Sequence, residues 1–356
     1  MPDPTTLLTL ARALGVSRTT VSNAYSRPHK LSPQLRERIL VTARELGYEG
    51  PSALASSLRT GRTETVGVLF TDDLGYAFSD PVATQFLAGV AGEVQGAGYA
   101  LTVVSSPRGS GRSALSKAML DGLIVYSVDD DSLGLTIMRR RGFPVVAVDQ
   151  APEADQAAVN ITDREGAAAA VAHLIGLGHT ALAAVAVAAG PLDCAFVDAD
   201  ATSRNHVVRE RLAGWRAACA AGGIAPPVTV SVPFNTREHG GHAARLLLAA
   251  RSRATGIVCL SDELALGVIT ELSAGGIGVP ADVSVVGFDD SPIAALATPP
   301  LTTVRQPARD KGAAAARRLL DLLGGAGPAD PVVLATELVI RRSSAARRPR
   351  ARKRAG

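Results

Sequence analysis

Hydrophobic residues recur at helical spacing three times within the first fifty positions. The apolar face of the first predicted helix consists of Leu7, Leu10, Ala11 and Leu14. Ser17 is suited to cap a second helix, and Ser32 followed by Pro33 begins a third, which ends at Gly47. Three short helices joined by tight turns predict a helix-turn-helix module, which we assign to residues 1–50.

The pattern changes after residue 62, where short apolar runs alternate with helical stretches. The runs that predict strands are 65–70, 99–104, 122–126, 144–149, 181–187, 228–232, 256–260 and 283–288. Runs of this kind are typical of strands covered on both faces in parallel α/β sheets. Residues 63–340 are therefore expected to form two α/β lobes with a cleft between them.

Composition narrows the class of protein. The chain has 356 residues, of which 47% are hydrophobic and 20% are charged, as in a folded protein of roughly two domains. The three cysteines, Cys194, Cys219 and Cys259, suit neither a disulfide framework nor a zinc cluster and favour a reducing compartment.

The sequence also shapes expectations about location and chemistry. Asp3 and Arg12 do not fit a signal peptide, and the apolar window 181–192 is too short to span a bilayer, so we expect a cytoplasmic protein without a membrane partner. His239 and His242 have no evident third ligand, and no nucleophile with a matching base stands out. We expect no metal, no cofactor and no enzymatic activity.

Charge is divided unevenly along the chain. Residues 1–62 hold nine Lys/Arg against four Asp/Glu, residues 63–340 hold twenty against twenty-nine, and residues 341–356 hold eight against none. A basic head on an acidic body indicates a module that binds a polyanion. The basic tail from residue 341 lacks apolar periodicity and is expected to be disordered.

The second predicted helix presents a polar face on which Arg18 pairs with Ser22 and Thr19 with Asn23. The segments GVSRTTVSNAYSRP, LSPQLRERIL and ARELGY resemble the DNA-binding head of the LacI/GalR family of transcriptional regulators. The resemblance implies that Arg18, Thr19 and Asn23 read bases of double-stranded DNA, for which Arg and Asn are chemically suited. Phosphate contacts are expected from Ser17, Thr20 and Ser22.

Residues 51–62 join the head to the body, and six or so of them could form a helix capped by Ser52. A helix of that length is marginal in isolation, which favours folding on DNA. The string ALASSLR is similar to the hinge helix of the same family, which implies that Leu58 wedges into the minor groove and Arg59 contacts DNA beside it. A plain linker with Leu58 packed on the body is the alternative.

The body resembles the effector domain of this family, which has the periplasmic sugar-binding-protein fold. The matching strings are HLIGLGH, RLAGWRAA, SDELALGV and VVGFDDSPIAALATPPLTTVRQP. The resemblance implies one lobe from residues 63–160 and 292–322, and a second from residues 161–291 with the terminal strand. No leucine heptad follows, so a homodimer is expected.

Candidate effector-binding residues come from strand ends and from the resemblance. Ligands of open α/β sheets bind beyond the carboxyl ends of strands, where Asp72, Ser127, Asp149, Ser261 and Asp289 stand. The resemblance adds the residues Arg211, Asn235, Phe78 and Asp80. Carboxylates and an arginine suit sugar hydroxyls. Asn235 stands where better-known members carry an aromatic ring, and Ser261 where an amide is common.

Together these features predict a transcriptional regulator that binds a pseudo-palindromic operator and responds to a small-molecule effector, expected to be a sugar or a sugar derivative. A repressor of carbohydrate uptake or catabolic genes fits the resemblance, with the effector acting either as inducer or as corepressor. The alternative is a solute-binding protein of a sugar transport system, which would leave the first sixty residues unexplained.

Overall fold

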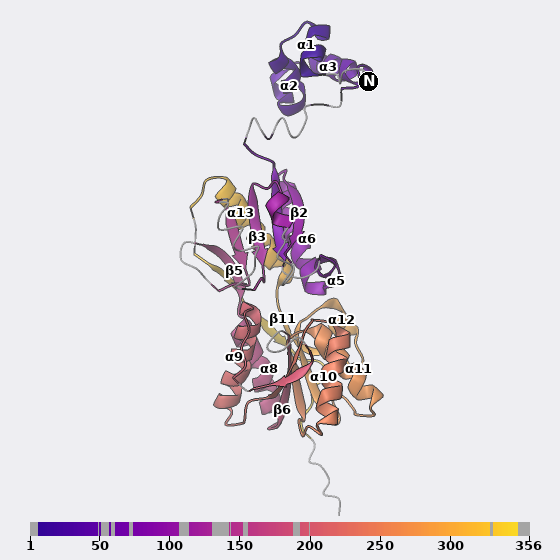
Figure 1. Ribbon diagram of the computed structural model, residues 1–356, viewed down its shortest axis with the longest axis vertical. Helices are drawn as coiled ribbons and strands as arrows, with labels where there is room; N and C mark the ends of the chain where they lie inside the picture. The colour runs from indigo at the N-terminus through magenta and orange to yellow at the C-terminus, as the bar shows by residue number, and fades with distance from the viewer. Residues whose placement is uncertain are drawn as a thin grey trace, which may run out of the picture. The chain divides into compact units, whose positions relative to one another are not determined.

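The computed structural model describes residues 6–48, 50, 57, 61–70, 74–106, 114–129, 142, 144–151, 156–187, 193–198, 200–327 and 330–347 (Figure 1). The chain divides into two compact units, Met1–Glu64 and Thr65–Gly356. Within the described residues, no helix is both long enough and apolar enough to cross a membrane.

The first unit contains the three predicted helices. They are α1 (Leu7–Leu14), α2 (Arg18–Ser26) and α3 (Pro33–Glu45), with a short 3-10 turn, η1 (Pro28–Lys30), before the third. The Ser17 hydroxyl accepts a hydrogen bond from the Thr20 amide at 3.0 Å, which caps α2 as predicted. The helices enclose a small core built around Leu10, Val21 and Ile39, all fully buried.

The first lobe of the second unit is a parallel sheet of six strands in the order β12-β5-β4-β3-β1-β2. The strands are β1 (Thr65–Phe70), β2 (Ala100–Ser105), β3 (Gly122–Tyr126), β4 (Val145–Val148), β5 (Ala157–Ile161) and β12 (Val332–Leu334). Its helices are α5 (Tyr76–Ser79), α6 (Pro81–Gly96), η2 (Ala114–Lys117) and α13 (Ala308–Leu323).

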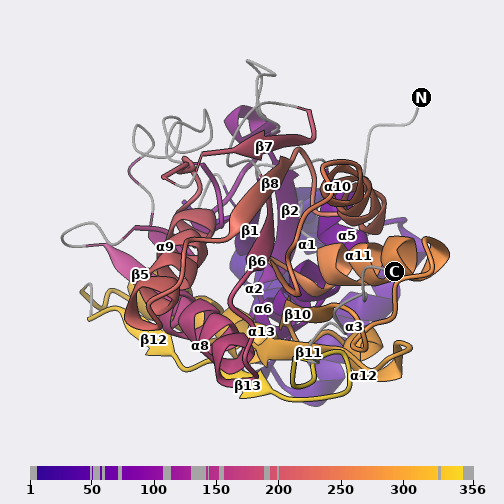
Figure 2. The ribbon, with the colours of Figure 1, turned by 90° about the horizontal axis from the view of Figure 1, so that it is seen from below.

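The second lobe is a sheet of seven strands in the order β13-β11-β10-β9-β6-β8-β7, antiparallel only at its two edges. The strands are β6 (Leu182–Val187), β7 (Ala195–Val197), β8 (Val228–Val232), β9 (Gly256–Cys259), β10 (Ser284–Asp289), β11 (Thr302–Arg305) and β13 (Glu337–Val339). The helices are α8 (Asp163–Gly176), α9 (His206–Ala221), α10 (Arg237–Ala249), α11 (Asp262–Ala274) and α12 (Pro292–Leu296). Figure 2 shows α8 and α9 on one side of this sheet and α10 and α11 on the other.

Two α/β lobes with largely parallel sheets confirm the predicted fold class, but the division of the chain between them needs a correction. Residues 292–305 belong to the second lobe, because β11 pairs with β10 in the register Phe288↔Val304. The chain crosses between the lobes after β5, after β11 and between β12 and β13. Two of these crossings contact each other: the Thr336 amide, between β12 and β13, donates to the Thr162 hydroxyl, after β5, at 2.9 Å.

Residues 341–347 also correct an expectation, because they are packed against the second lobe. Ser343 is fully buried, and its hydroxyl donates to the Val285 carbonyl at 2.6 Å and accepts from the Thr302 amide at 2.8 Å. The expectation of disorder from residue 341 is therefore wrong for these seven residues. Hydrogen bonds between the Ser343 hydroxyl and the backbone of the second lobe hold this segment in place despite its basic charge. The rest of the basic tail lies outside the described residues.

The paired helices approach closely through glycine. A Cβ atom at Gly312 of α13 would overlap the carbonyl oxygen of Phe86 on α6, and one at Gly89 would overlap the carbonyl oxygen of Arg309. Arg317 and Glu93 form an ion pair at 2.5 Å on the exposed side of the same contact. The two helices α6 and α13 therefore pack closely only because glycine stands at these positions.

Candidate functional site in the cleft between the lobes

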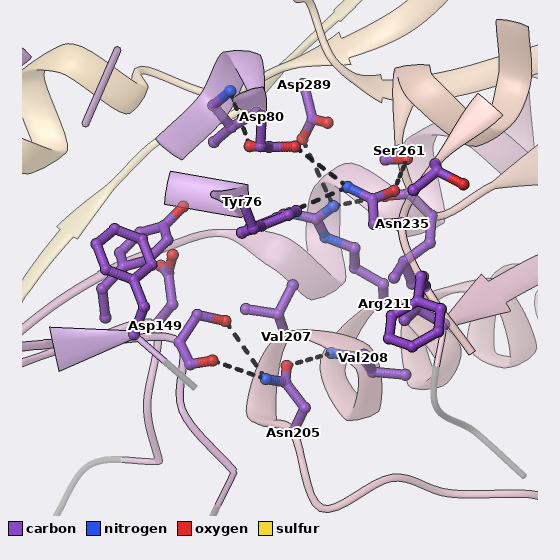
Figure 3. A pocket seen from close by; sticks show the side chains of 18 of the residues that line it. Tyr76, Asp80, Asp149, Asn205, Val207, Val208, Arg211, Asn235, Ser261 and Asp289 are labelled. Carbon is purple, nitrogen blue, oxygen red and sulfur yellow. Dashed lines mark hydrogen bonds and ion pairs between the residues drawn. The ribbon is translucent and has the colours of Figure 1, made fainter. Parts of the chain in front are cut away.

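A cavity of about 360 Å³ lies between the two lobes of the second unit (Figure 3). Both lobes contribute residues at the carboxyl ends of parallel strands or at the starts of helices. The polar residues that line it are Tyr76, Ser79, Asp80, Tyr126, Ser127, Asp149, Asn205, Arg211, Asn235, Thr236, Ser261, Asp289 and Gln306. Phe70, Phe234 and several aliphatic side chains complete the wall.

Three of the lining residues have a positive φ angle, a backbone conformation that residues other than glycine rarely adopt. Ser127 follows β3, Asp149 follows β4 and Asp289 ends β10, and their φ angles are 45°, 56° and 124°. Residues other than glycine with positive φ store strain and gather at functional sites. The strained turns aim the polar side chains of these strand ends into the cavity.

Arg211 of α9 is the buried cation of the second-lobe wall, with 5% of its surface exposed. Its Nε donates to Asp163 Oδ1 at 2.7 Å and its Nη1 donates to the Leu260 carbonyl at 2.6 Å. Its guanidinium carbon lies 3.5 Å from the centre of the Phe288 ring, and Nη1 is 3.7 Å from Asp289 Oδ1. These contacts hold the planar donor group in one orientation beside the cavity.

Lys311 of α13 lies under the first-lobe wall. Its Nζ donates to Asp149 Oδ2 at 2.5 Å and to Gln306 Oε1 at 2.9 Å. Gln306 Nε2 in turn donates to Asp289 Oδ1 at 2.6 Å. A continuous polar network therefore joins the carboxylate at the end of β4 to the carboxylate at the end of β10.

Two asparagines bridge the lobes at the rim of the cavity. Asn235 Nδ2 donates to Asp80 Oδ2 at 3.3 Å, and the Ser261 hydroxyl donates to Asn235 Oδ1. Figure 3 shows this row of contacts from Asp80 through Asn235 to Ser261. Asn205 Nδ2 donates to the Ser127 carbonyl at 3.1 Å. The two bridges join the lobes beside the cavity.

Burial disfavours the ionised forms of the acidic groups around the cavity. It raises the pKa of Asp80, against hydrogen bonds from the Ala83 and Val82 amides and from Tyr76 that lower it. Burial also raises the pKa of Asp289 well above its usual range, although Arg211 opposes the shift. The pKa of the Tyr126 hydroxyl is raised by burial and by the nearby charge of Asp149. The site is thus rich in hydrogen-bond acceptors whose ionised forms are disfavoured by burial.

The first unit offers a second candidate surface on α2. Arg18 and Thr19 are exposed there, while Thr20, Ser22 and Asn23 are half-buried. The Ser17 hydroxyl caps the helix and lies 2.8 Å from the Thr20 hydroxyl. Because Val21 and Ala24 point into the core, this polar side of α2 faces away from it.

Comparison with known proteins decides which family these two features belong to. A helix-turn-helix-type transcriptional regulator of Mycobacterium tuberculosis is 42% identical over 328 residues, which are 88% of this chain and 90% of that protein. The structure of the lac repressor dimer bound to operator and an anti-inducer matches with a TM-score of 0.80 at 26% identity, over 97% of this chain and 100% of that chain. This chain belongs to the LacI family of transcriptional regulators.

Two further matches concern the body of this LacI-family regulator. The family model for a periplasmic binding protein-like domain matches residues 171–344. A structure of the transcriptional regulator CelR in complex with cellobiose matches with a TM-score of 0.70 at 29% identity, over 96% of this chain and all of that chain. The prediction of a regulator is confirmed over the alternative of a solute-binding protein, and relatives named as regulators agree with the expectation that it is not an enzyme.

The structure of the regulator brings together most of the predicted effector residues. Those that line the cavity are Asp80, Ser127, Asp149, Arg211, Asn235, Ser261 and Asp289. Phe78 does not line the cavity and is 63% exposed. Asp72 lies outside the described residues, as do Leu58 and Arg59 of the predicted hinge helix. Binding of an effector by the lining residues stays a prediction.

Six polar lining residues of the regulator were not among the predicted effector contacts: Tyr76, Ser79, Tyr126, Asn205, Thr236 and Gln306. Two of them carried a signal, because Tyr126 ends a predicted strand and Asn205 precedes a helix that it caps. Tyr76 lies on the short helix α5, and Gln306 lies in a crossover whose position only the tertiary structure reveals. Lys311, which does not line the cavity, gave no sign of burial.

Proposed function

We propose that this LacI-family protein is a dimeric, effector-responsive repressor of carbohydrate uptake or catabolic genes. The observation that carries the proposal is the cavity between the lobes, lined by Asp149, Arg211 and Asp289, in a chain that also has the three helices of a helix-turn-helix head. The effector acts from within this cavity, and the head contacts the operator.

The effector is a sugar or a sugar derivative. Ionised carboxylates only accept hydrogen bonds, whereas an arginine only donates them, so the wall matches a ligand that carries several hydroxyl groups. Asp80, Asn235 and Ser261 would complete the polar contacts from the rim, and Ser127 and Asp289 from the strand ends. The cellobiose complex of CelR supports this class of ligand.

The DNA contacts come from the polar side of α2 and from the linker. Arg18, Thr19 and Asn23 read base edges in the major groove, and Ser17, Thr20 and Ser22 contact phosphates. Leu58 and Arg59 act in the minor groove when the linker folds. Two copies of the chain bind the two half-sites of a pseudo-palindrome, as the operator complex of the lac repressor dimer supports.

The effector changes operator affinity by changing the relative arrangement of the two lobes. A ligand shifts a conformational equilibrium only by its difference in affinity for the two states. The Asn235 and Asn205 bridges exist in the closed arrangement, so a ligand that fits between them favours closure. In the dimer, closure changes the positions of the two first lobes. Each first lobe is joined to its DNA-binding head by one linker, residues 51–62.

Capture of sheared genomic DNA from the host by the purified full chain tests the proposal, with the full-length Asn23→Ala variant beside it. We expect a short pseudo-palindrome to be enriched by the native chain and recovered less selectively by the variant. Sugars suggested by the neighbouring genes are then tested for elution. Absence of any enriched sequence, with and without a pool of sugars, would refute the operator-binding function.

A further inference from the structure

Lys311 is a buried lysine behind the lining of the cavity, where it contacts the lining residues Asp149 and Gln306. Of the three lysines in the described part of the chain, Lys30 and Lys117 are exposed, whereas Lys311 is 1% exposed. Its Nζ donates to Asp149 Oδ2 and Gln306 Oε1 and lies 5.4 Å from the centre of the Tyr126 ring. Burial of an ammonium group is costly, so its contacts must compensate for lost hydration.

The lysine imposes one direction on the hydrogen bonds around it. An ammonium group only donates, so it requires the oxygen of the Gln306 amide, and the amide nitrogen must then face Asp289. Asp289 is thereby required to accept. One cation thus sets how the carboxylates of both lobes are presented to a ligand.

The network leaves one acceptor unused. Asp149 Oδ1 is buried and has no hydrogen-bond partner among the described residues, while its sister oxygen binds Lys311. Asp149 lines the cavity and is 3% exposed. A buried unsatisfied acceptor is destabilising, so this oxygen is suited to accept a donor from a ligand.

Charge in the buried network is unbalanced. In the described part of the chain it contains four carboxylates, Asp80, Asp149, Asp163 and Asp289, and two cations, Arg211 and Lys311. Full ionisation of all four would give a formal excess of two negative charges, and burial, which raises the pKa of Asp80, Asp163 and Asp289, reduces that excess. An anionic ligand would add to the excess, whereas a neutral ligand rich in hydroxyls would not.

We propose that Lys311 is a specificity-determining positioning residue, which orients Asp149 and Gln306 so that the pocket accepts an uncharged, hydroxyl-rich ligand and rejects phosphorylated or carboxylated ones. The inference rests on the proposed sugar-binding function of the same cavity. It also predicts the effect of losing the cation. Without Lys311 the negative excess grows, and an ammonium group on the ligand can replace the missing charge.

Matched ligand series test the proposal on the full chain. Each series consists of a neutral sugar (glucose, galactose or ribose) with its amino, phosphate and carboxylate analogues, and binding is measured by calorimetry. The variants are Lys311→Met, Lys311→Gln and the double variant Asp149→Asn/Lys311→Met, which removes one charge of each sign. Lys117→Met, at an exposed lysine of the same lobe, is the matched control.

The measured quantity is the ratio of affinities for the amino and neutral members of a series, which general destabilisation does not change. We expect the native chain to bind a neutral member and to bind its anionic analogues at least roughly tenfold more weakly. Both single variants should raise the amino-to-neutral ratio by roughly tenfold or more. The double variant and Lys117→Met should keep the native ratio. If Lys311→Met does not fold, Lys311→Gln still reports the ratio.

The possible failures are distinguishable. A native chain that prefers an anionic member, or a ratio that is unchanged in both single variants, would overturn the role of Lys311 and leave the sugar-effector proposal standing. A native chain that binds operator DNA but no member of any series would overturn the sugar-effector proposal, and this inference with it.

Discussion

Asn235 and Asp80 meet across the cleft, with Asn235 Nδ2 3.3 Å from Asp80 Oδ2. The orientation of the amide is fixed, because the Ser261 hydroxyl donates to its oxygen and leaves only the nitrogen to face the first lobe. Asp80 is held as well, since its other carboxylate oxygen caps α6 through the Val82 and Ala83 amides. A neutral amide therefore joins the two lobes at the rim of the pocket.

Replacement of Asn235 by alanine should weaken the effector response. The variant loses the bridge and leaves Asp80 Oδ2 without that donor, a change of roughly 1–2 kcal/mol, so operator release should need about tenfold more effector. Fluorescence anisotropy of labelled operator DNA during effector titration measures this. His242→Ala, on the adjoining helix α10 and outside the pocket lining, is the control. An unchanged release concentration for Asn235→Ala would argue against the bridge.

Gly312→Ala should destabilise the body, whereas Gly92→Ala should not. A Cβ atom at Gly312 would overlap the Phe86 carbonyl of α6, but one at Gly92, within α6, would meet nothing within 4 Å. Forced separation of packed helices costs roughly 1–3 kcal/mol, while alanine in place of a helical glycine is favourable by roughly 0.5–1 kcal/mol. Chemical denaturation of the two variants gives both values, and equal effects would contradict the close packing of α6 against α13.

The fold could be predicted well where the signal was local. The strands over 65–70 and 122–126 are continuous apolar runs, and the structure places strands at both. β5 was missed because its run AAVNI is short and carries Asn160, whose side chain pairs with the backbone of Gln150. β11 was assigned to the wrong lobe. The lobe to which this strand belongs is determined by its pairing with β10 and not by its own sequence.

The residues of the site likewise fall into those that local sequence predicts and those that depend on the tertiary structure. Ser127, Asp149 and Asp289 could be found from strand ends alone, since parallel strands bring their carboxyl ends to one edge. The burial of Lys311 could not be predicted, because the segment DKGAAAARR around it has the pattern of a solvent-exposed helix. Its burial depends on Asp149, 162 positions earlier in the chain, and no local pattern encodes that contact.

Asp262 should make stability depend on pH. Burial raises its pKa from 3.8 to about 7, although Thr303 and Ser291 donate hydrogen bonds that lower it. The folded state therefore holds the proton more tightly than the unfolded state, and stability falls as pH rises from about 4 to about 7. Asp262→Asn cannot ionise, so the stability of the native chain relative to this variant should fall over that range.

Thermal unfolding at several pH values between 4 and 8 measures this difference, and Asp310→Asn, at an exposed position of α13, is the control. For the control, the stability difference from the native chain should vary less with pH. A difference between Asp262→Asn and the native chain that is constant with pH, or that grows in favour of the native chain as pH rises, would show that Asp262 stays ionised in the folded protein.

Asn23→Ala should alter base discrimination more than overall DNA affinity. Asn23 lies on the polar side of α2, half-buried, and an asparagine amide can form two hydrogen bonds with adenine. Its loss should remove roughly 1–3 kcal/mol of discrimination at one base pair and leave the other positions unchanged. Binding of the variant to a set of operators with single-base changes measures this position by position. Thr9→Ala, exposed on α1, should leave the whole profile unchanged. A uniform loss of affinity across all operators would instead assign Asn23 to a phosphate contact.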